Sequence, residues 1–311
     1  MKKIELKSYA KINLSIDILG KYENGYHQVE MVMQHINLFD LISIKWFENE
    51  PADSFEISIK TDKFYLPTDN RNLAYKAAEI MYEKYGQGRK GTVRIDMKKN
   101  IPVAAGLAGG SGNGAAVIHG LNVLWDLNID LEELCQVSSA LGSDVPFTLM
   151  GQAKTNKCLG EEMNNHRLAV TCALAEGTGT ELTPLPALNS RILLSKPSIS
   201  VSTAEVYKGM KLDELEERPD NKKLIDGLKN ADISTVTENM ANVLEQYTLA
   251  NYDVVQKTKD KIKEVCPEGF VLMSGSGPSV FAIVSSDKEL EEGYEVMKNI
   301  NKETYKTRTL I

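Results

Sequence analysis

The part of this sequence best suited to chemistry is IPVAAGLAGGSGNGAAV, residues 101–117, which has five glycines in seventeen positions. Each glycine costs up to about 1 kcal/mol of conformational entropy on folding, so the run indicates a backbone that approaches another group closely. The glycines lead into small helix-forming residues, and the N–H groups at a helix start attract phosphate oxygens. The spacing predicts a phosphate-binding loop at a helix N-terminus. Lys98 and Lys99, just upstream, are expected to be solvated.

Other interpretations of these glycines have different support. A P-loop requires the pattern GxxxxGK[ST], and no lysine follows any glycine pair here. A dinucleotide fingerprint, GxGxxA, is satisfied from Gly110 to Ala115, with Asp130 about twenty residues on. However, Pro102 and the 104–110 stretch separate the glycines from any strand, and Asp130 is typical of a helix cap. A tight structural turn without a ligand also stays open.

Composition limits the class of protein. With 311 residues, the chain is long enough for two lobes or two domains. Its net charge of -7 and pI near 5.4 mean that the protein has no overall positive electrostatic potential to attract polyanions, so neither nucleic acid nor an anionic membrane is an expected partner. No apolar run approaches the roughly 20 residues needed to span a bilayer, and Glu5 and Lys7 interrupt the N-terminal segment. A cytoplasmic protein is expected.

Cysteine and histidine spacing gives no sign of a metal site. The cysteines have no CxxC pair, and the histidines lack HExxH or finger spacing, so no metal ligands are predicted. The four cysteines are expected to be reduced packing residues.

The elements that would position the glycine loop follow from periodicity. Strands are expected over 2–18, 29–47, 92–98 and 191–202; helices from Asn72 to Gly86, Ala115 to Leu127 and Asp130 to Gly142; and a hairpin over 269–286. Prolines and small polar residues over 182–190 indicate a domain boundary.

Beside the glycine loop, the motifs AKINL, GYH, SDVPF and SGSGP occur in one order along nearly the whole chain. Together with the loop they resemble the GHMP kinases. The resemblance implies an α+β, two-lobed GHMP kinase fold: an N-terminal α/β lobe (ribosomal S5 domain 2-like) over 1–182, which carries the ATP loop, and a C-terminal ferredoxin-like lobe over 183–311.

The resemblance also implies an activity. Within the family the motifs look most like those of kinases that use ATP and Mg²⁺ to phosphorylate a hydroxyl of 4-diphosphocytidyl-2-C-methyl-D-erythritol, a cytidylyl sugar alcohol of non-mevalonate isoprenoid synthesis. Asp144 in SDVPF matches the base that takes the hydroxyl proton, and Lys11 in AKINL matches its partner. A cation beside a carboxylate keeps it ionised and helps neutralise the transferring phosphoryl group.

Binding residues are carried over in the same way. Tyr26 and His27 match residues that receive the cytosine ring, Tyr207 matches the aromatic on its other face, and Asn13 and Thr203 resemble polar substrate contacts. The turn over 275–279 resembles a motif that backs the active site. The oligomeric state expected is monomer or homodimer. The ATP loop comprises Pro102, Val103, Ala104, Ala105, Gly106, Leu107, Ala108, Gly109, Gly110, Ser111, Gly112 and Asn113.

The sequence departs from the family pattern at four places. Gly112 lacks a hydroxyl that could bind a phosphate oxygen, Gly114 loosens the helix start, and Thr180 replaces a common glutamate. Residues 152–170 are extra and suggest a surface hairpin or flap. Three alternatives stay open: a catalytically weak nucleotide-binding paralogue, suggested by Gly112, Gly114 and Thr180; a GHMP kinase of another small alcohol; and a nicotinamide oxidoreductase, suggested by the GxGxxA pattern.

Overall fold

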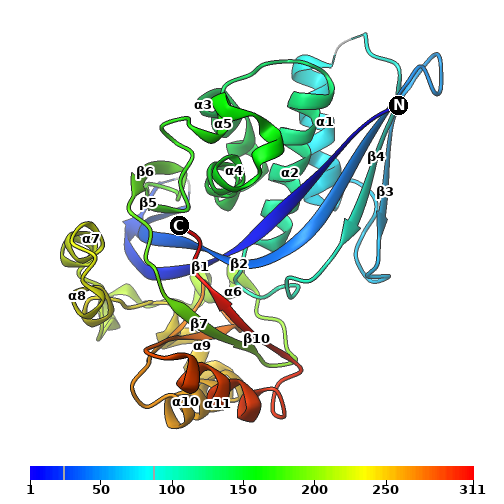
Figure 1. Cartoon of the computed structure of the whole chain (residues 1–311). Helices are drawn as coiled ribbons and strands as arrows, with labels where there is room; N and C mark the ends of the chain where they lie inside the picture. Colours follow the sequence, from blue (N-terminus) through cyan, green and yellow to red (C-terminus); the bar gives the residue numbers. More distant parts are fainter. Residues whose placement is uncertain (24, 87) are drawn as a thin grey trace. The chain divides into compact units, whose positions relative to one another are not determined.

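The computed structural model describes residues 1–23, 25–86 and 88–311. The chain forms two compact units (Figure 1). Unit 1 comprises Met1–Ala10, Leu38–Ile101 and Ala108–Val170; unit 2 comprises Lys11–Asn37, Pro102–Leu107 and Thr171–Ile311. Both are discontinuous because the long strands β1 (Lys2–Lys21) and β2 (His27–Glu48) contribute to each. The domain boundary at 182/183 stays a prediction.

Unit 1 is a sheet covered by helices. In it β2 pairs antiparallel with β4 (Gly91–Lys98), which pairs in parallel with β3 (Phe55–Thr61). The helices α1 (Leu73–Tyr85), α2 (Gly109–Leu124), α3 (Leu131–Ser138) and α4 (Asp144–Thr155) lie together on one face of these strands (Figure 1). A 3-10 turn, η1 (Ser139–Leu141), joins α3 to α4. Alternate β2 residues enter the core, which also holds the chain's two tryptophans, Trp46 and Trp125, with ring centroids 5.7 Å apart.

Three predicted helix boundaries are confirmed. The Asn72 side chain caps α1 by accepting from the Ala74 N–H, and Gly86 ends that helix. Asp130 caps α3 by accepting from the Glu133 N–H at 2.9 Å. Both caps depend on neighbours in sequence, which is why the sequence alone predicts them.

The predicted start of α2 was wrong. The helix begins at Gly109, six residues before Ala115, so the glycines themselves form its first turns. The low helix propensity of glycine is overridden by close packing. A Cβ at Gly112 would lie 2.4 Å from Ser8 Oγ, and one at Gly120 would lie 2.3 Å from Ile44 Cδ1. Glycine at these two positions lets α2 approach the strands without displacing the Ser8 and Ile44 side chains.

The predicted hairpin or flap over 152–170 was also wrong. These residues continue α4 and then form η2 (Lys157–Leu159) and α5 (Glu161–Asn164). Ala153 is fully buried and Leu168 packs against the unit 1 core. The Asn156 side chain accepts from the Lys7 N–H at 2.8 Å and donates to the Lys7 carbonyl at 3.1 Å. The segment is anchored because its apolar residues face the core.

Unit 2 contains two groups of strands. Met31–Gln34 of β2 pair antiparallel with β5 (Cys172–Glu176), which pairs with β6 (Glu181–Leu185). A second, antiparallel sheet has the order β10 (Glu303–Arg308), β7 (Arg191–Lys196), β9 (Val280–Val284), β8 (Phe270–Met273). The predicted hairpin is confirmed as β8 and β9.

Helices complete unit 2. The helices α10 (Asp253–Val265) and α11 (Asp287–Met297) lie on one face of the four-stranded sheet (Figure 1). The segment before them forms α6 (Thr203–Gly209), η3 (Leu212–Glu214), α7 (Asn221–Lys229), α8 (Ile233–Glu238) and α9 (Glu245–Asn251). None of the described helices has the length and apolarity needed to cross a membrane.

Candidate active site

The start of α2 has the geometry of a phosphate site. This sixteen-residue helix has no side-chain cap, and its N-cap residue, Ala108, has a left-handed φ of 55°. The N–H groups of the first turn are therefore available at the positive end of the helix dipole. Residues 109–113, predicted to bind ATP, form this first turn and the start of the second. Phosphate oxygens are the ligands such an arrangement favours.

A buried ion pair holds this helix start in place. The Lys99 and Asp40 side chains are 4% and 0% exposed, and the Lys99 ammonium donates to the Asp40 carboxylate. Asp40 also accepts from Asn113 Nδ2 at 2.9 Å and from the backbone N–H groups of Asn100 and Ile101 at 2.7 and 2.9 Å. The expectation that Lys99 is solvated was wrong, because Asp40 from β2 provides a buried counter-charge.

This ion pair also accounts for Asn113. Its Oδ1 accepts from Lys99 Nζ at 2.8 Å, so both ends of its side-chain amide are used inside unit 1. Asp40 and Lys99 were missed as functional residues. A single aspartate in a strand gives no sequence signal of a partner 59 residues away.

The departure at Gly112 has a structural explanation. The residue is buried, and a side chain there would point at Ser8 Oγ on β1. A hydroxyl at position 112 would thus meet the interior of unit 1. A side chain at position 112 would therefore point away from a phosphate bound at the helix start, so glycine there removes no phosphate ligand.

Asp144 is the first residue of α4 and is half-buried. The helix N-terminus stabilises a negative charge at that position. Hydrogen bonds from side chains to backbone fasten α4 to α2: Gln152 Nε2 donates to the Gly112 carbonyl at 2.7 Å, and His119 Nε2 donates to the Leu149 carbonyl at 3.0 Å. The helix that carries Asp144 is therefore tied to the helix that begins at the glycine loop.

His119 is itself an unusual group. It is fully buried, its Nδ1 has no hydrogen-bond partner among the described residues, and burial lowers its pKa to about 4, partly opposed by its bond to Leu149. The imidazole is neutral at physiological pH, and it serves as a polar fastening between α2 and α4.

In unit 2, β1 presents a row of buried polar side chains. Lys11, Asn13, Ser15 and Asp17 occupy alternate positions and therefore share one face of the strand. Lys11 Nζ donates to Asn13 Oδ1 at 2.7 Å, and Asn13 Nδ2 contacts Met31 Sδ at 3.4 Å. The structure thus brings the predicted residues Lys11 and Asn13 together. The same period of two was visible in the sequence beyond Asn13, so Ser15 and Asp17 could have been predicted.

The remote end of this row fastens the segment before α7. Arg218 Nη1 lies 2.6 Å from Asp17 Oδ1, and Ser15 Oγ donates to Asn221 Oδ1 at 2.5 Å. Burial raises the pKa of Asp17, while Arg218 opposes that rise. Asn221 Nδ2 also donates to Glu30 Oε1 at 2.7 Å. The chain between α6 and α7 is held to β1 and β2 by charge and amide contacts.

Two of the predicted base-binding residues are in contact. The His27 and Tyr207 rings have centroids 5.1 Å apart and are tilted by 48°. Tyr26 is 65% exposed. Burial, assisted by the charge of Lys21, lowers the pKa of His27, so its ring is neutral at pH 7 and able both to donate and to accept a hydrogen bond.

Two of the remaining predicted residues, Gly106 and Thr203, contact the β8–β9 turn. The loop over 102–107 meets β1 through a hydrogen bond from the Lys11 N–H to the Leu107 carbonyl at 3.2 Å. Its Gly106 has a φ of 71°, and the Gly106 carbonyl accepts from Ser274 Oγ at 2.9 Å. Thr203 contacts Ser276 of the same turn. Asp144 and residues 108–113 belong to unit 1 and the other predicted residues to unit 2, so the pairing of Lys11 with Asp144 stays a prediction.

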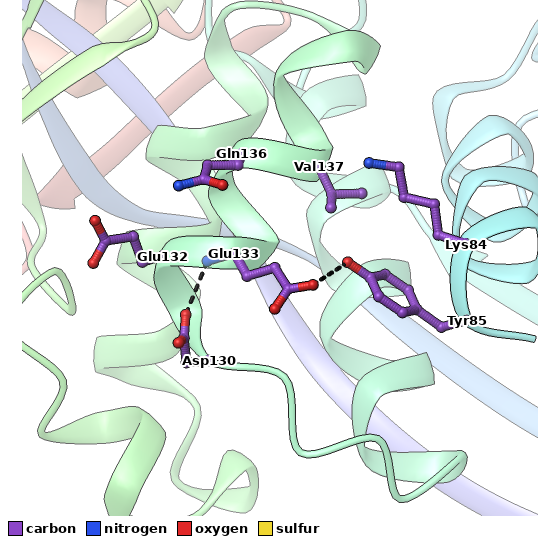
Figure 2. A pocket seen from close by; sticks show the side chains of 7 residues that line it. All are labelled: Lys84, Tyr85, Asp130, Glu132, Glu133, Gln136 and Val137. Carbon is purple, nitrogen blue, oxygen red and sulfur yellow. Dashed lines mark hydrogen bonds between the residues drawn. The ribbon is translucent and has the colours of Figure 1, made fainter.

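A hollow of about 460 Å³ in unit 1 is lined by none of the predicted site residues. Figure 2 shows the side chains around it. Tyr85 OH donates to Glu133 Oε1 at 2.7 Å across it. Burial, followed by this bond and the Glu133 charge, raises the pKa of Tyr85 to about 12. The hollow reflects how the end of α1 packs on α3. It is lined by Lys84, Tyr85, Asp130, Glu132, Glu133, Gln136 and Val137.

Comparison with known proteins agrees with this geometry. The model of the GHMP kinase N-terminal domain matches residues 72–152, and that of the GHMP kinase C-terminal domain matches residues 224–303. The chain belongs to the GHMP kinase family. It is therefore a phosphotransferase that uses ATP as donor and a small molecule as acceptor.

Within the GHMP kinase family, the chain is similar in sequence to kinases of one kind. The chain is 42% identical to 4-diphosphocytidyl-2-C-methyl-D-erythritol kinase of Alkaliphilus metalliredigens, covering 98% of this chain and 96% of the relative. It is 41% identical to the Clostridioides difficile protein of the same name, covering 97% and 94%. A crystal structure of 4-(cytidine 5'-diphospho)-2C-methyl-D-erythritol kinase superposes with a TM-score of 0.76 at 24% identity, covering 98% of this chain and 99% of that one. Homoserine kinase from Cytophaga hutchinsonii follows with a TM-score of 0.69 at 17% identity, covering 100% and 96%. The predicted two-lobed α+β kinase fold is confirmed.

Proposed function

We propose that this kinase transfers the γ-phosphoryl group of ATP to a hydroxyl of 4-diphosphocytidyl-2-C-methyl-D-erythritol in non-mevalonate isoprenoid synthesis. The observation that carries the proposal is identity of about 40% over nearly the whole chain to kinases of that name. We place the protein in the cytoplasm, acting as a monomer or homodimer.

Asp144 is the proposed base. It takes the proton of the substrate hydroxyl as the oxygen bonds to the γ-phosphorus, while the bond from that phosphorus to the β,γ-bridging oxygen breaks and releases ADP. The N–H groups at the start of α2 stabilise phosphate charge, and Lys11 neutralises charge at the reacting group. Its hydrogen bond to Asn13 fixes the direction of its ammonium within unit 2.

Mg²⁺ fits this chain as an ion delivered with ATP. Among the described residues, no group of three or more His, Cys, Asp or Glu side chains could hold a metal ion. Mg²⁺ commonly keeps several waters and binds through substrate phosphates, where it neutralises their charge. The hydroxyl of Ser111, in the first turn of α2, is the chain's proposed oxygen for the hydration shell of that ion.

Substrate recognition is proposed for the unit 2 residues. The His27 and Tyr207 rings already touch, so a cytosine stacks on Tyr207 while His27 hydrogen-bonds its edge. Tyr26, largely exposed, covers the base from solvent, and Asn13 and Thr203 hold the polar part of the substrate.

The test is ADP release coupled to NADH oxidation, with ATP, Mg²⁺ and the cytidylyl substrate. Wild-type protein turns over, and Asp144→Asn, which keeps the shape of the side chain but cannot accept the proton, lowers kcat by at least about 1000-fold. An active Asp144→Asn protein refutes the assigned base. The same assay with a panel of other small alcohols tests whether the kinase acts on a different substrate. If calorimetry shows ATP binding but none of these alcohols is phosphorylated, the protein is a catalytically weak paralogue.

A further inference from the structure

The turn between β8 and β9 is a rigid platform. Within it, the Ser274 N–H donates to the Ser279 carbonyl at 2.9 Å, and the Gly277 N–H donates to the Ser274 carbonyl at 3.0 Å. Asn242 Nδ2 donates from outside to the carbonyls of Met273 and Gly275, both at 2.8 Å. These bonds fix the turn on both of its sides, so side chains that project from it have well-defined positions.

Thr248, in α9, adds a further bond by donating to the Ser276 carbonyl at 3.2 Å. The backbone of Ser276 is thereby held directly. Ser276 is buried, with 5% of the residue exposed, so its hydroxyl has few alternative partners.

Two serines of this turn contact two different parts of the proposed site. Ser274 Oγ donates to the Gly106 carbonyl in the glycine loop at 2.9 Å. Ser276 Oγ lies 2.9 Å from Oγ1 of Thr203, which is the first residue of α6. The two hydroxyls thus act on the nucleotide side and the acceptor side separately.

Two contacts hold the first turn of α6: the Ser202 side chain caps the helix by accepting from the Glu205 N–H at 3.3 Å, and Ser276 contacts Thr203. Only Val206 is buried among its seven residues, and Thr203 is exposed. Glu205 accepts from Tyr252 OH at 3.0 Å, which fastens the middle of the helix to the start of α10. A short helix anchored at its middle leaves the direction of its first side chain to local contacts, and for Thr203 that contact is Ser276.

We propose that Ser276 is a positioning residue for the acceptor substrate. Its hydroxyl sets the rotamer of Thr203, and by occupying one hydrogen-bonding site of the Thr203 hydroxyl it aims the other at the substrate. The proposal rests on the proposed function, since that assigns Thr203 to the substrate. It adds a residue that touches no reactant and acts only through its neighbour.

The experiment compares Ser276→Ala with Ser274→Ala, the same change two residues away in the same turn. Loss of one neutral hydrogen bond corresponds to a change of about 3- to 10-fold. Ser276→Ala is expected to raise the substrate KM by this factor and to leave the ATP KM and kcat within about twofold. Ser274→Ala, by freeing the Gly106 carbonyl, is expected to raise the ATP KM instead.

Substitution of Thr203 tests the same hydrogen bond from its other end. Because Thr203 is exposed, its substitution is less disruptive to the fold. Thr203→Val keeps the shape without the hydroxyl and is expected to raise the substrate KM at least as much as Ser276→Ala. Thr203→Ser retains the hydroxyl and restores the wild-type value. In Thr203→Val/Ser276→Ala, the loss of the Ser276 hydroxyl adds nothing, because Thr203 can no longer be oriented for hydrogen bonding.

The outcomes separate the two proposals. If Thr203→Val raises the substrate KM and a folded Ser276→Ala protein does not, the positioning role is overturned while the proposed function stands. The positioning role also fails if the effects of the two substitutions add fully. Calorimetry measures binding of the substrate to the wild-type protein. If the substrate does not bind, both the proposed function and this inference are refuted.

Discussion

His119 makes the stability of unit 1 depend on pH in a way that can be calculated. Burial lowers its pKa from 6.5 to about 4, so between these values the unfolded chain binds a proton that the folded chain excludes. This contribution to stability is complete above pH 6.5 and is lost as the pH falls toward 4. Between pH 7 and pH 5 it lowers the free energy of unfolding by about 2 kcal/mol, and by about 3 kcal/mol in the acid limit.

The matched variant is His119→Gln. A glutamine amide keeps a donor for the Leu149 carbonyl at the place of Nε2 but does not titrate. Both tryptophans lie in the core of unit 1, so urea unfolding followed by tryptophan fluorescence reports this unit. Carboxylates elsewhere titrate in the same range in both proteins and cancel in the comparison.

The expected result is a difference that grows with acid. The free energy of unfolding of the wild type should fall by about 2 kcal/mol more than that of His119→Gln when the pH changes from 7 to 5. Equal pH dependence of the two proteins would refute the reasoning, because it would mean that the imidazole can be protonated in the folded state at little cost.

Three further predictions concern the glycine loop and the substrate residues. Asp40→Ala leaves the Lys99 ammonium buried without its carboxylate and should lower the stability of unit 1 by about 3 to 5 kcal/mol in the same urea assay; the double variant with Lys99→Met should recover most of the loss, and a full loss in the double variant would contradict the pairing. Ala108→Gly relieves a left-handed φ and should raise stability by up to about 1 kcal/mol, so a lower thermal midpoint would argue against that conformation. Tyr207→Ala removes a stacking surface worth about 1 to 3 kcal/mol and should weaken substrate binding about 5- to 150-fold in calorimetry, whereas an equal loss of ATP affinity would contradict a base-stacking role.

The sequence predicts those features that depend on neighbours along the chain. The caps at Asn72 and Asp130 involve residues two or three positions away, and the β8–β9 hairpin follows from two apolar runs around a glycine turn. The family motifs likewise identified the kinase fold because their order covers the chain.

Contacts between distant segments account for what the sequence could not give. The early start of α2 requires knowing that Ser8 and Ile44 leave no room for side chains at Gly112 and Gly120. The burial of Lys99 requires Asp40, which comes from another strand. Such pairings belong to the tertiary structure, where packing outweighs the local preference of each residue.

The extra segment after α4 has a consequence for association between molecules. Among the strands that the structure describes, β1 pairs with β2, and on its other edge Lys11 bonds to Leu107 and Ile16 bonds to residues 241–243. The Asn156 amide occupies both the N–H and the carbonyl of Lys7, as a neighbouring strand would, and Cys158 Sγ lies 3.7 Å from the carbonyl of Glu5, two residues before Lys7. Unpaired strand edges are a recognised route to aggregation. Residues 156–158 therefore cover the edge of β1 near Lys7 and block its pairing with a strand of another molecule.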